Sequence, residues 1–456
     1  MSPPEAFSSQ ISTEVCPPLR QPPLQSNANR LGGFDLVRIL AALGVVLLHA
    51  SAPYLVQPMP GLTWPVFDTP SPIVNFFGWS IELFIMPLFL LMAGYFSPAI
   101  FRKQQGWGFV RHRYQRLIIP LLVAMVLILP ADLYIWLTGW LIEGLISPRK
   151  IQTLKFENGV DEGLWGLSHL WFLLYLFLYA VSWASGKHVF QKYKIAWPLS
   201  SAATIATLAL FGWAMLVSVP QVVFGFQHAF LPVPSKWFYS GTFFLGGIIL
   251  ADSDKLNAFC GKHALRLLLS GATTTALGVY FGCQMMLPES NVVDRVLATL
   301  LTVLAAWTIS LGAVGWASTT HFPSTTRIRY LAAASFWVYL VHHPIVGLCH
   351  IQLKVVVPDW PAEAKMLAAT ATGVIFALLS FEIMIRRWPF AGLLGTPKEF
   401  TKSVSSDQTA PAMTDESAAE TIQRTHSTGG LQACQGVSSI GLSPQPWRAS
   451  SSASTR

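Results

Sequence analysis

The sequence predicts an all-α polytopic membrane protein, a bundle of about ten transmembrane helices with disordered termini. Hydrophobic residues make up 52% of the 456 residues and charged residues only 11%, whereas an average soluble domain has about 25% charged residues. The mean hydropathy is +0.48, and the apolar residues gather in runs long enough to cross a bilayer. These observations exclude a large soluble protein.

The charge and the cysteines exclude further classes. The net charge is +8, and the basic residues gather in short loops between apolar runs, which indicates topology signals and no nucleic-acid surface. The five cysteines contain no Cys-x-x-Cys pair, so neither a disulfide framework nor a zinc site is indicated.

Both ends of the chain differ from the middle. Residues 1–32 are polar and Pro-rich, which predicts a disordered cytoplasmic tail and an uncleaved first helix. Residues 396–456 are rich in Ser, Thr, Ala, Gln and Gly and predict a second such tail. The membrane domain is expected at 33–395, and any chemistry must lie there.

Ten apolar segments are expected to be the helices, and a further interfacial piece is expected near 139–147. The segments are 34–53, 73–97, 117–138, 165–185, 195–217, 237–252, 264–286, 296–317, 329–350 and 366–386.

Alternate loops carry the positive charge, which predicts that both termini are cytoplasmic. The basic residues of these loops are Arg102, Lys103, Arg111, Arg113, Arg116, Lys187, Lys192, Lys194, Arg327, Arg329, Arg386, Arg387 and Lys398. The intervening loops are mixed or acidic, with Asp68, Glu143, Asp161, Glu162, Glu289, Asp359 and Glu363.

The first apolar segment holds Arg38 and His49 with ten residues between them. On one helix this spacing is about 16 Å, with both side chains on nearly the same face. Ionisable groups inside a membrane segment usually face a cavity or a partner and mark function. The alternative is that Arg38 extends to the headgroups and His49 is a hydrogen-bonded packing residue.

The predicted topology also indicates how deep in the membrane the other buried polar groups lie. Glu82 lies near mid-membrane, and three histidines share the outer half with His49; these are His169, His342 and His343. A histidine beside a carboxylate suits a general base, since the unperturbed pKa of imidazole is about 6.5.

Each of these residues also has a structural interpretation. Glu82 could equally be a structural partner for a histidine or an arginine. His169 could equally anchor the helix at the membrane interface beside Trp171. His342 and His343 point about 100° apart on a helix, so at most one is expected to face the site. No metal is expected, because nothing in this spacing is specific for one.

Arg113 and Arg116 share a helix face in a cytoplasmic loop. Arginine pairs bind phosphates well, and coenzyme A carries phosphates. From charge alone, topology or anionic lipid is the favoured interpretation. Glu382 lies at about the depth of Arg38, so these two could pair.

Several motifs together resemble the acyltransferase-3 family of integral membrane acyltransferases, in its glucan-modifying branch (OpgC/MdoC-like). Besides Arg38 and His49, they are Met86-Pro-Leu-Phe through Gly94-Tyr-Phe, the RxxRLxxP run at Arg113–Pro120, Ser168-His-Leu-Trp-Phe-Leu-Leu, Tyr339-Leu-Val-His-His-Pro, and Phe381-Glu-Ile through Pro389. The resemblance covers roughly 30–398. The chain departs from it at Ile85, often histidine in relatives, and at Ala93.

The resemblance implies a cytoplasmic acyl-CoA donor, succinyl-CoA or acetyl-CoA, and a periplasmic or lumenal glycan acceptor. It also implies that Arg38 and His49 are an essential pair and that Arg113 and Arg116 assist donor binding.

The expected function is therefore membrane O-acyl transfer, with His49 as general base aided by Glu82 or by His342 or His343. The expected location is the inner membrane. A transporter or flippase with a buried His/Glu proton relay is the alternative, although no clear internal repeat supports it. A sensor or interaction protein is the last alternative, and it leaves the buried charges without a role.

Overall fold

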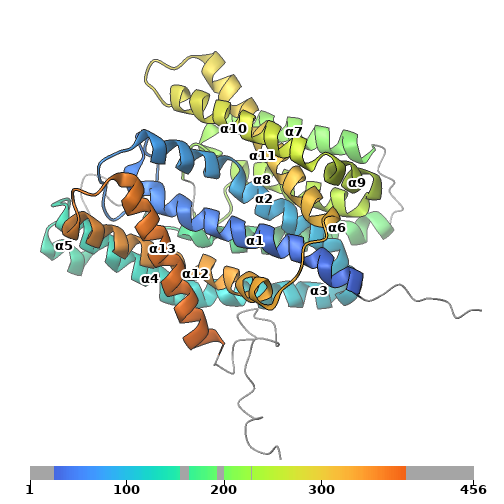
Figure 1. The fold of residues 1–456 in the computed structure, drawn as a ribbon, viewed down its shortest axis with the longest axis horizontal. Helices are drawn as coiled ribbons and strands as arrows, with labels where there is room; N and C mark the ends of the chain where they lie inside the picture. Colours follow the sequence, from blue (N-terminus) through green and yellow to red (C-terminus); the bar gives the residue numbers. More distant parts are fainter. Residues whose placement is uncertain (1–24, 155–163, 193–199, 227–228, 387–456) are drawn as a thin grey trace, which may run out of the picture. The chain divides into compact units, whose positions relative to one another are not determined.

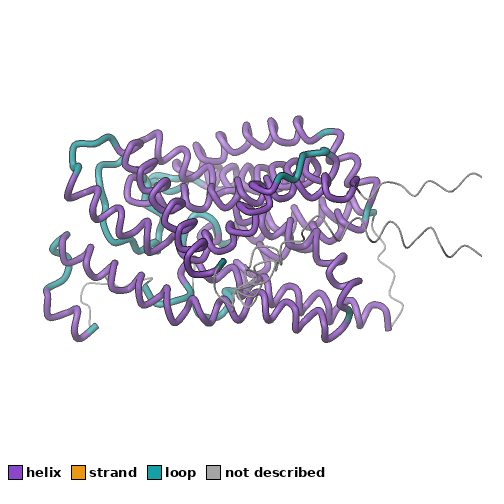
Figure 2. Tube along the Cα trace, turned by 60° about the horizontal axis from the view of Figure 1, so that its bottom comes forward, coloured by secondary structure: helices purple, strands orange, loops and turns teal. Residues whose placement is uncertain are grey.

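The fold consists of helices that lie mostly along one common direction (Figures 1 and 2). The computed structural model describes residues 25–154, 164–192, 200–226 and 229–386, and these contain no strand. The helices are α1 (Gln25–Ser51), α2 (Pro72–Gln104), α3 (Gly106–Arg113), α4 (Ile119–Ile142), α5 (Pro148–Thr153), α6 (Trp171–Lys192), α7 (Ser201–Ser218), α8 (Pro234–Asp252), α9 (Asp254–Lys262), α10 (Ala264–Met285), α11 (Val292–Thr319), α12 (Thr326–Val356) and α13 (Ala362–Ser380).

Short turns join some of these helices. Three are 3-10 turns, η1 (Ala52–Tyr54), η3 (Ser168–Leu170) and η4 (Pro220–Val222). Two are π-helical segments, η2 (Tyr114–Ile118) and η5 (Phe381–Ile385).

The predicted helical membrane fold is confirmed. Each of the ten apolar segments contains a long helix, and nine helices among the described residues are long and apolar enough to cross a membrane. The tenth, α8, is not among those nine and carries Lys236 and Asp252 near its two ends.

The boundaries differ from the predicted ones at several places. α1 begins at Gln25, so the last residues of the predicted N-terminal tail belong to this helix. Residues 106–142 form one helical span, because η2 joins α3 to α4. Where one interfacial piece was expected near 139–147, α4 runs to Ile142 and α5 begins at Pro148. The rest of the predicted tails, with Lys398, lies outside the described residues, and so do the loop residue Lys194 and Arg387 after the last helix.

Side chains at the helix starts explain where several helices begin. The Ser71 hydroxyl accepts hydrogen bonds from the Ile73 and Val74 amides, and Pro72 follows it in the first turn of α2. Asn291 and Asp294 form a reciprocal capping box at the start of α11. These caps supply acceptors to amides that a helix itself leaves unpaired.

Glycines let α2 and α8 approach closely. A Cβ atom on Gly94 would lie 2.0 Å from the Phe244 carbonyl oxygen, and one on Gly247 would lie 2.0 Å from the Leu91 carbonyl oxygen. In lipid, helices associate through such small residues, since apolar burial gives little drive between them. The α2–α8 contact holds Glu82 and Lys236 on neighbouring helices.

The two ends of the bundle differ in charge. α3 and α9 lie at the end on the right of Figure 1 and α5 at the other. We call the first the arginine end, because it carries Arg38, Arg102, Arg113 and Arg116. At the opposite end, two lysines pair with loop acids, Lys354 with Glu143 at 2.6 Å and Lys365 with Asp68 at 2.7 Å.

Candidate active site

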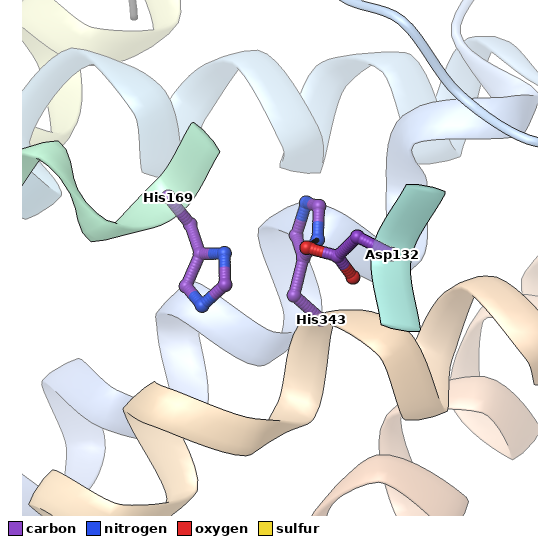
Figure 3. A group of neighbouring side chains, drawn as sticks. All are labelled: Asp132, His169 and His343. Carbon is purple, nitrogen blue, oxygen red and sulfur yellow. Dashed lines mark hydrogen bonds and ion pairs between the residues drawn. The ribbon is translucent and has the colours of Figure 1, made fainter. Parts of the chain in front are cut away.

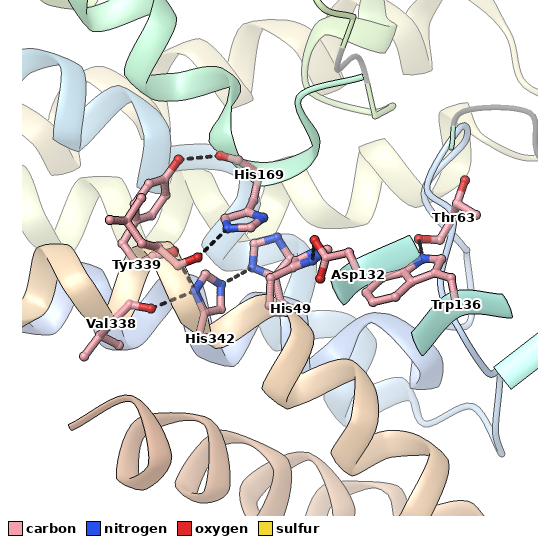
Figure 4. Close-up of polar contacts among 10 residues, drawn as sticks. His49, Thr63, Asp132, Trp136, His169, Val338, Tyr339 and His342 are labelled. Carbon is pink, nitrogen blue, oxygen red and sulfur yellow. Dashed lines mark hydrogen bonds and ion pairs between the residues drawn. The ribbon is translucent and has the colours of Figure 1, made fainter. Parts of the chain in front are cut away.

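Four histidines meet inside the bundle (Figure 4). His49 comes from α1, His169 from η3, and His342 and His343 from α12. The His49 ring centroid lies 5.0 Å from those of His342 and His343, and the His169 centroid lies 4.5 Å from that of His343. All four are buried. The shared depth assigned from the sequence thus corresponds to direct contact, and both histidines of the 342–343 pair take part.

Hydrogen bonds determine which nitrogens of His49 and His342 carry a proton. Nδ1 of His342 faces the carbonyl oxygens of Val338 and Tyr339 at 3.0 and 2.9 Å. A carbonyl only accepts, so His342 Nδ1 donates and its Nε2 is an acceptor. That Nε2 lies 3.0 Å from His49 Nδ1, which also faces the Val45 carbonyl at 3.0 Å. His49 Nδ1 is therefore the donor, and His49 Nε2 is left unprotonated.

Beside the hydrogen-bonded pair of His49 and His342 lies a second pair, formed by Asp132 of α4 and His343 (Figure 3). His343 Nδ1 lies 3.0 Å from Asp132 Oδ2 and donates to the carboxylate. This bond orients the imidazole and makes its Nε2 the acceptor. Asp132 was not predicted from the sequence, although a lone carboxylate inside an apolar segment is itself a sign of function.

His169 is held between two residues of α12. Its Nε2 lies 3.1 Å from the Leu340 carbonyl oxygen and donates to it. The Tyr339 hydroxyl donates to the His169 carbonyl oxygen. Because its ring is buried and stacked on His343, His169 lies within the histidine cluster and does not serve as an interfacial anchor.

Asp132, His169 and His343 have possible metal-ligand atoms within 4.8 Å of one another. The His169 and His343 rings are stacked, with 21° between their planes. Imidazole lone pairs lie in the ring plane, so two stacked rings do not direct them at one ion. A metal would fit this group only after one ring rotated.

His49 and His169 line a small cavity of about 70 Å³, the histidine cavity. Glu82 and Lys236 also line it. The Lys236 ammonium lies 3.7 Å from the Trp171 ring centroid. Lys236 was not predicted from the sequence, because it precedes the apolar segment at 237–252.

A larger cavity of about 460 Å³ opens among arginines, and we call it the arginine cavity. Arg38, Arg113 and Arg116 line it together with His112. Arg113 donates to the Ser97 hydroxyl at 3.0 Å, and Arg116 lies in the π-helical segment η2. Such segments are frequent at functional sites.

The possible pairing of Arg38 with Glu382 is wrong. Arg38 lies 3.7 Å from Asp35 on its own helix, and Glu382 lies 2.7 Å from Arg386. Arg38 lines the arginine cavity instead.

The two cavities adjoin. Met86, from the Met86-Pro87 motif of α2, lines both the arginine cavity and the histidine cavity. Tyr339 lines the arginine cavity, and its ring centroid lies 5.8 Å from that of His169. A thin molecule in the arginine cavity would therefore pass Met86 to reach His49.

Comparison with known proteins identifies the family. The sequence matches the acyltransferase domain family, known as acyltransferase-3, over residues 31–382. The chain belongs to this family. It is similar to glucans biosynthesis protein C of Salmonella heidelberg (strain SL476) and of Salmonella agona (strain SL483), 25% identical over 376 residues, 77% of this chain and 91% of each relative. The protein of that name from Salmonella dublin is 24% identical over the same shares. No solved structure matches.

The protein is thus an acyltransferase with several membrane-spanning helices. In this acyltransferase the arginine and the histidine of the first membrane helix do not touch the same cavity. Arg38 lines the arginine cavity and His49 the histidine cavity.

Proposed function

We propose that this acyltransferase transfers a succinyl or acetyl group from acyl-CoA to a hydroxyl of a cell-envelope glycan. The donor enters the arginine cavity from the cytoplasm, and the acceptor enters from the opposite end. The observation that carries the proposal is the hydrogen-bond chain from His342 to His49, which leaves His49 Nε2 free to accept a proton beside a cavity that adjoins the arginines.

The arginine cavity suits the donor. Arg38, Arg113 and Arg116 offer planar guanidinium groups, which bind phosphate oxygens in pairs. Along α1 the distance from Arg38 to His49 is about 16 Å, a span that an extended pantetheine arm can cover. Phosphates held by the arginines would thus place the thioester carbon near His49.

The transfer needs one proton acceptor. The hydroxyl oxygen bonds to the thioester carbonyl carbon, its proton passes to His49 Nε2, and the C–S bond breaks to release the coenzyme A thiolate. Protonated His49 keeps its Nδ1–H bond to His342 Nε2, which stabilises the positive imidazolium. The proton then passes to the thiolate, so the enzyme returns to its starting state.

Further residues support this reaction. Glu82 lines the histidine cavity with His49, and a carboxylate there stabilises the imidazolium. The glycan acceptor is proposed from the relatives, which are named for glucan biosynthesis. We also propose an inner-membrane location with both termini in the cytoplasm, since Arg102, Arg113 and Arg116 gather at one end of the bundle.

The test uses purified full-length protein with labelled succinyl-CoA and, separately, labelled acetyl-CoA, and linear glucan as acceptor. Wild type is expected to label the glucan from one of the two donors, and His49→Ala to lower the rate at least about a hundredfold, as for loss of a general base. His321→Ala is the matched control, because His321 is exposed in a loop. Equal rates for wild type and His49→Ala would overturn the assigned base, and no labelled glucan from either donor would overturn the proposed reaction.

A further inference from the structure

A third cavity, of about 230 Å³, borders the histidine cluster on the side of α4, and we call it the aromatic chamber. Its lining shares no residue with that of the arginine cavity. It shares Leu62 and Phe226 with the histidine cavity. A molecule in the aromatic chamber would therefore approach the histidines from another direction than one in the arginine cavity.

Polar, aromatic and aliphatic side chains line the aromatic chamber. The polar side is formed by Asp132 and His343, which are hydrogen-bonded at 3.0 Å. The apolar side combines four aromatic residues, Trp136, Trp165, Phe226 and Phe230, with aliphatic side chains that come mostly from α4. Trp165 is 53% exposed and Phe230 50% exposed, although both line the cavity.

The polar side is built for a hydroxyl. Because Asp132 holds the Nδ1 proton, Nε2 of His343 is an acceptor for a hydroxyl hydrogen. Asp132 Oδ1 is buried and has no hydrogen-bond partner among the described residues. Buried polar atoms are nearly always paired, so this oxygen is an acceptor without its usual partner next to the His343 bond.

Trp136 is held in position beside that polar pair. Trp136 donates its indole N–H to the Thr63 carbonyl at 2.8 Å and stacks on His343 at 5.0 Å between centroids. Its ring therefore has one orientation. Aromatic faces beside a few fixed polar groups are typical of a small-molecule site.

We propose that the aromatic chamber is the acceptor subsite and binds one hexose ring of the glycan. A pyranose has apolar C–H faces and a rim of hydroxyls. In the chamber a C–H face packs on Trp165, and a hydroxyl donates to His343 Nε2, which Asp132 orients. The volume equals that of about seven or eight water molecules, which is enough for one ring. The inference rests on the proposed function and names where its acceptor binds.

A ring in this position can reach the reaction centre. Leu62 and Phe226 separate the aromatic chamber from the histidine cavity by a single layer of side chains, since both residues line each. A neighbouring hydroxyl of the bound glycan would extend past them towards His49. His343 and Asp132 then bind and position the acceptor, while His49 takes the proton of the reacting hydroxyl.

Binding and turnover are measured separately. Linear glucan oligosaccharide is titrated into full-length protein in lipid nanodiscs, and binding is followed by calorimetry without donor. Trp165→Ala and Asp132→Asn are each expected to weaken binding about tenfold, through lost aromatic contact and lost orientation of His343. In the transfer assay both are expected to raise the KM for glucan by a similar factor, with the KM for acyl-CoA unchanged. Trp107→Ala, an exposed tryptophan at the arginine end, is the matched control.

The outcomes separate this inference from the proposed function. Unchanged glucan affinity in both variants would overturn the acceptor subsite, even if wild type transfers acyl groups. Wild type that binds glucan through Trp165 but transfers no acyl group would support the subsite and contradict the proposed reaction. A lipid-linked sugar that binds wild type while free glucan does not would overturn the assignment to a free glycan ring.

Discussion

At the scale of single residues, His342 decides how well His49 can accept a proton. His342 lines none of the three cavities described above, and it acts on His49 through one hydrogen bond of 3.0 Å. His342→Leu removes the acceptor, so kcat is expected to fall about ten- to a hundredfold, the effect of one hydrogen bond to a charged group. The KM for acyl-CoA is expected to stay unchanged. Initial rates of label transfer measure both.

The conservative variant distinguishes positioning from packing. The side-chain oxygen of glutamine can accept from His49 Nδ1–H, so His342→Gln is expected to keep most of the wild-type kcat. If the glutamine and leucine variants lose the same activity, the role of His342 is packing alone.

The residues of the site differ in how far sequence could predict them. Depth along each helix follows from counting residues, so His49, His169, His342 and His343 were placed at one level. Rotation about each helix axis does not follow from counting. The sequence therefore could not tell that His342 contacts His49 whereas His343 contacts Asp132. Asp132 carried a usable signal, because a carboxylate in an apolar segment is costly.

At the scale of helices, the α2–α8 contact holds one side of the histidine cavity. Gly247→Ala would put a methyl group 2.0 Å from the Leu91 carbonyl oxygen, so the helices must separate, at a cost of about 1–3 kcal/mol. We expect a lower thermal midpoint in detergent and a lower transfer rate, because Glu82 and Lys236 move apart.

Gly186→Ala is the matched control for that variant. A Cβ atom on Gly186, in α6, meets no atom within 4 Å. Alanine is favoured over glycine in a helix by about 1 kcal/mol, so this change is expected to leave stability equal or higher. A similar loss in both variants would show that the close contact does not matter.

The loop before α2 is tied to α13 by Asp68 and Lys365. Partial burial acts to raise the pKa of Asp68, but the hydrogen bond from Lys365, the Thr69 amide and the charges of Lys365 and Lys354 outweigh it, and the pKa is lowered. The folded state thus binds this proton more weakly than the unfolded chain. The stabilisation is full above the unfolded pKa of about 3.9 and is lost as pH falls through the folded pKa.

Asp68→Asn removes this dependence. At pH 7 the variant is expected to unfold about 2 °C below wild type, on the order of 1 kcal/mol, since Lys365 is buried and loses its ion pair, although it keeps its bond to the Pro358 carbonyl at 2.7 Å. As the pH falls below about 4, the wild-type midpoint is expected to approach that of the variant. Thermal unfolding from pH 7 to about pH 2 measures the difference between the two midpoints, and a difference that stays constant down to the lowest pH would contradict the assigned ion pair.

At the scale of the whole molecule, the lipid bilayer that surrounds the helices determines most of the fold. Backbone groups in lipid must pair internally, so each long apolar run becomes a helix, and the ten runs were enough to predict the bundle. The short helices α3, α5 and α9 were missed because they are too short and too polar for that rule. The cavities also could not be predicted, since they depend on how helices rotate and pack.

The orientation of the whole protein in the membrane can be tested directly. The excess of arginine at one end predicts that this end faces the cytoplasm. In a cysteine-free background, Gln104→Cys places a thiol at the arginine end and Glu289→Cys places one in the exposed loop between α10 and α11. In sealed right-side-out vesicles, a membrane-impermeant thiol reagent is expected to label only the Glu289→Cys variant. Detergent should then make both react. Labelling of Gln104→Cys alone in sealed vesicles would invert the topology, and the arginine cavity would then face away from cytoplasmic acyl-CoA.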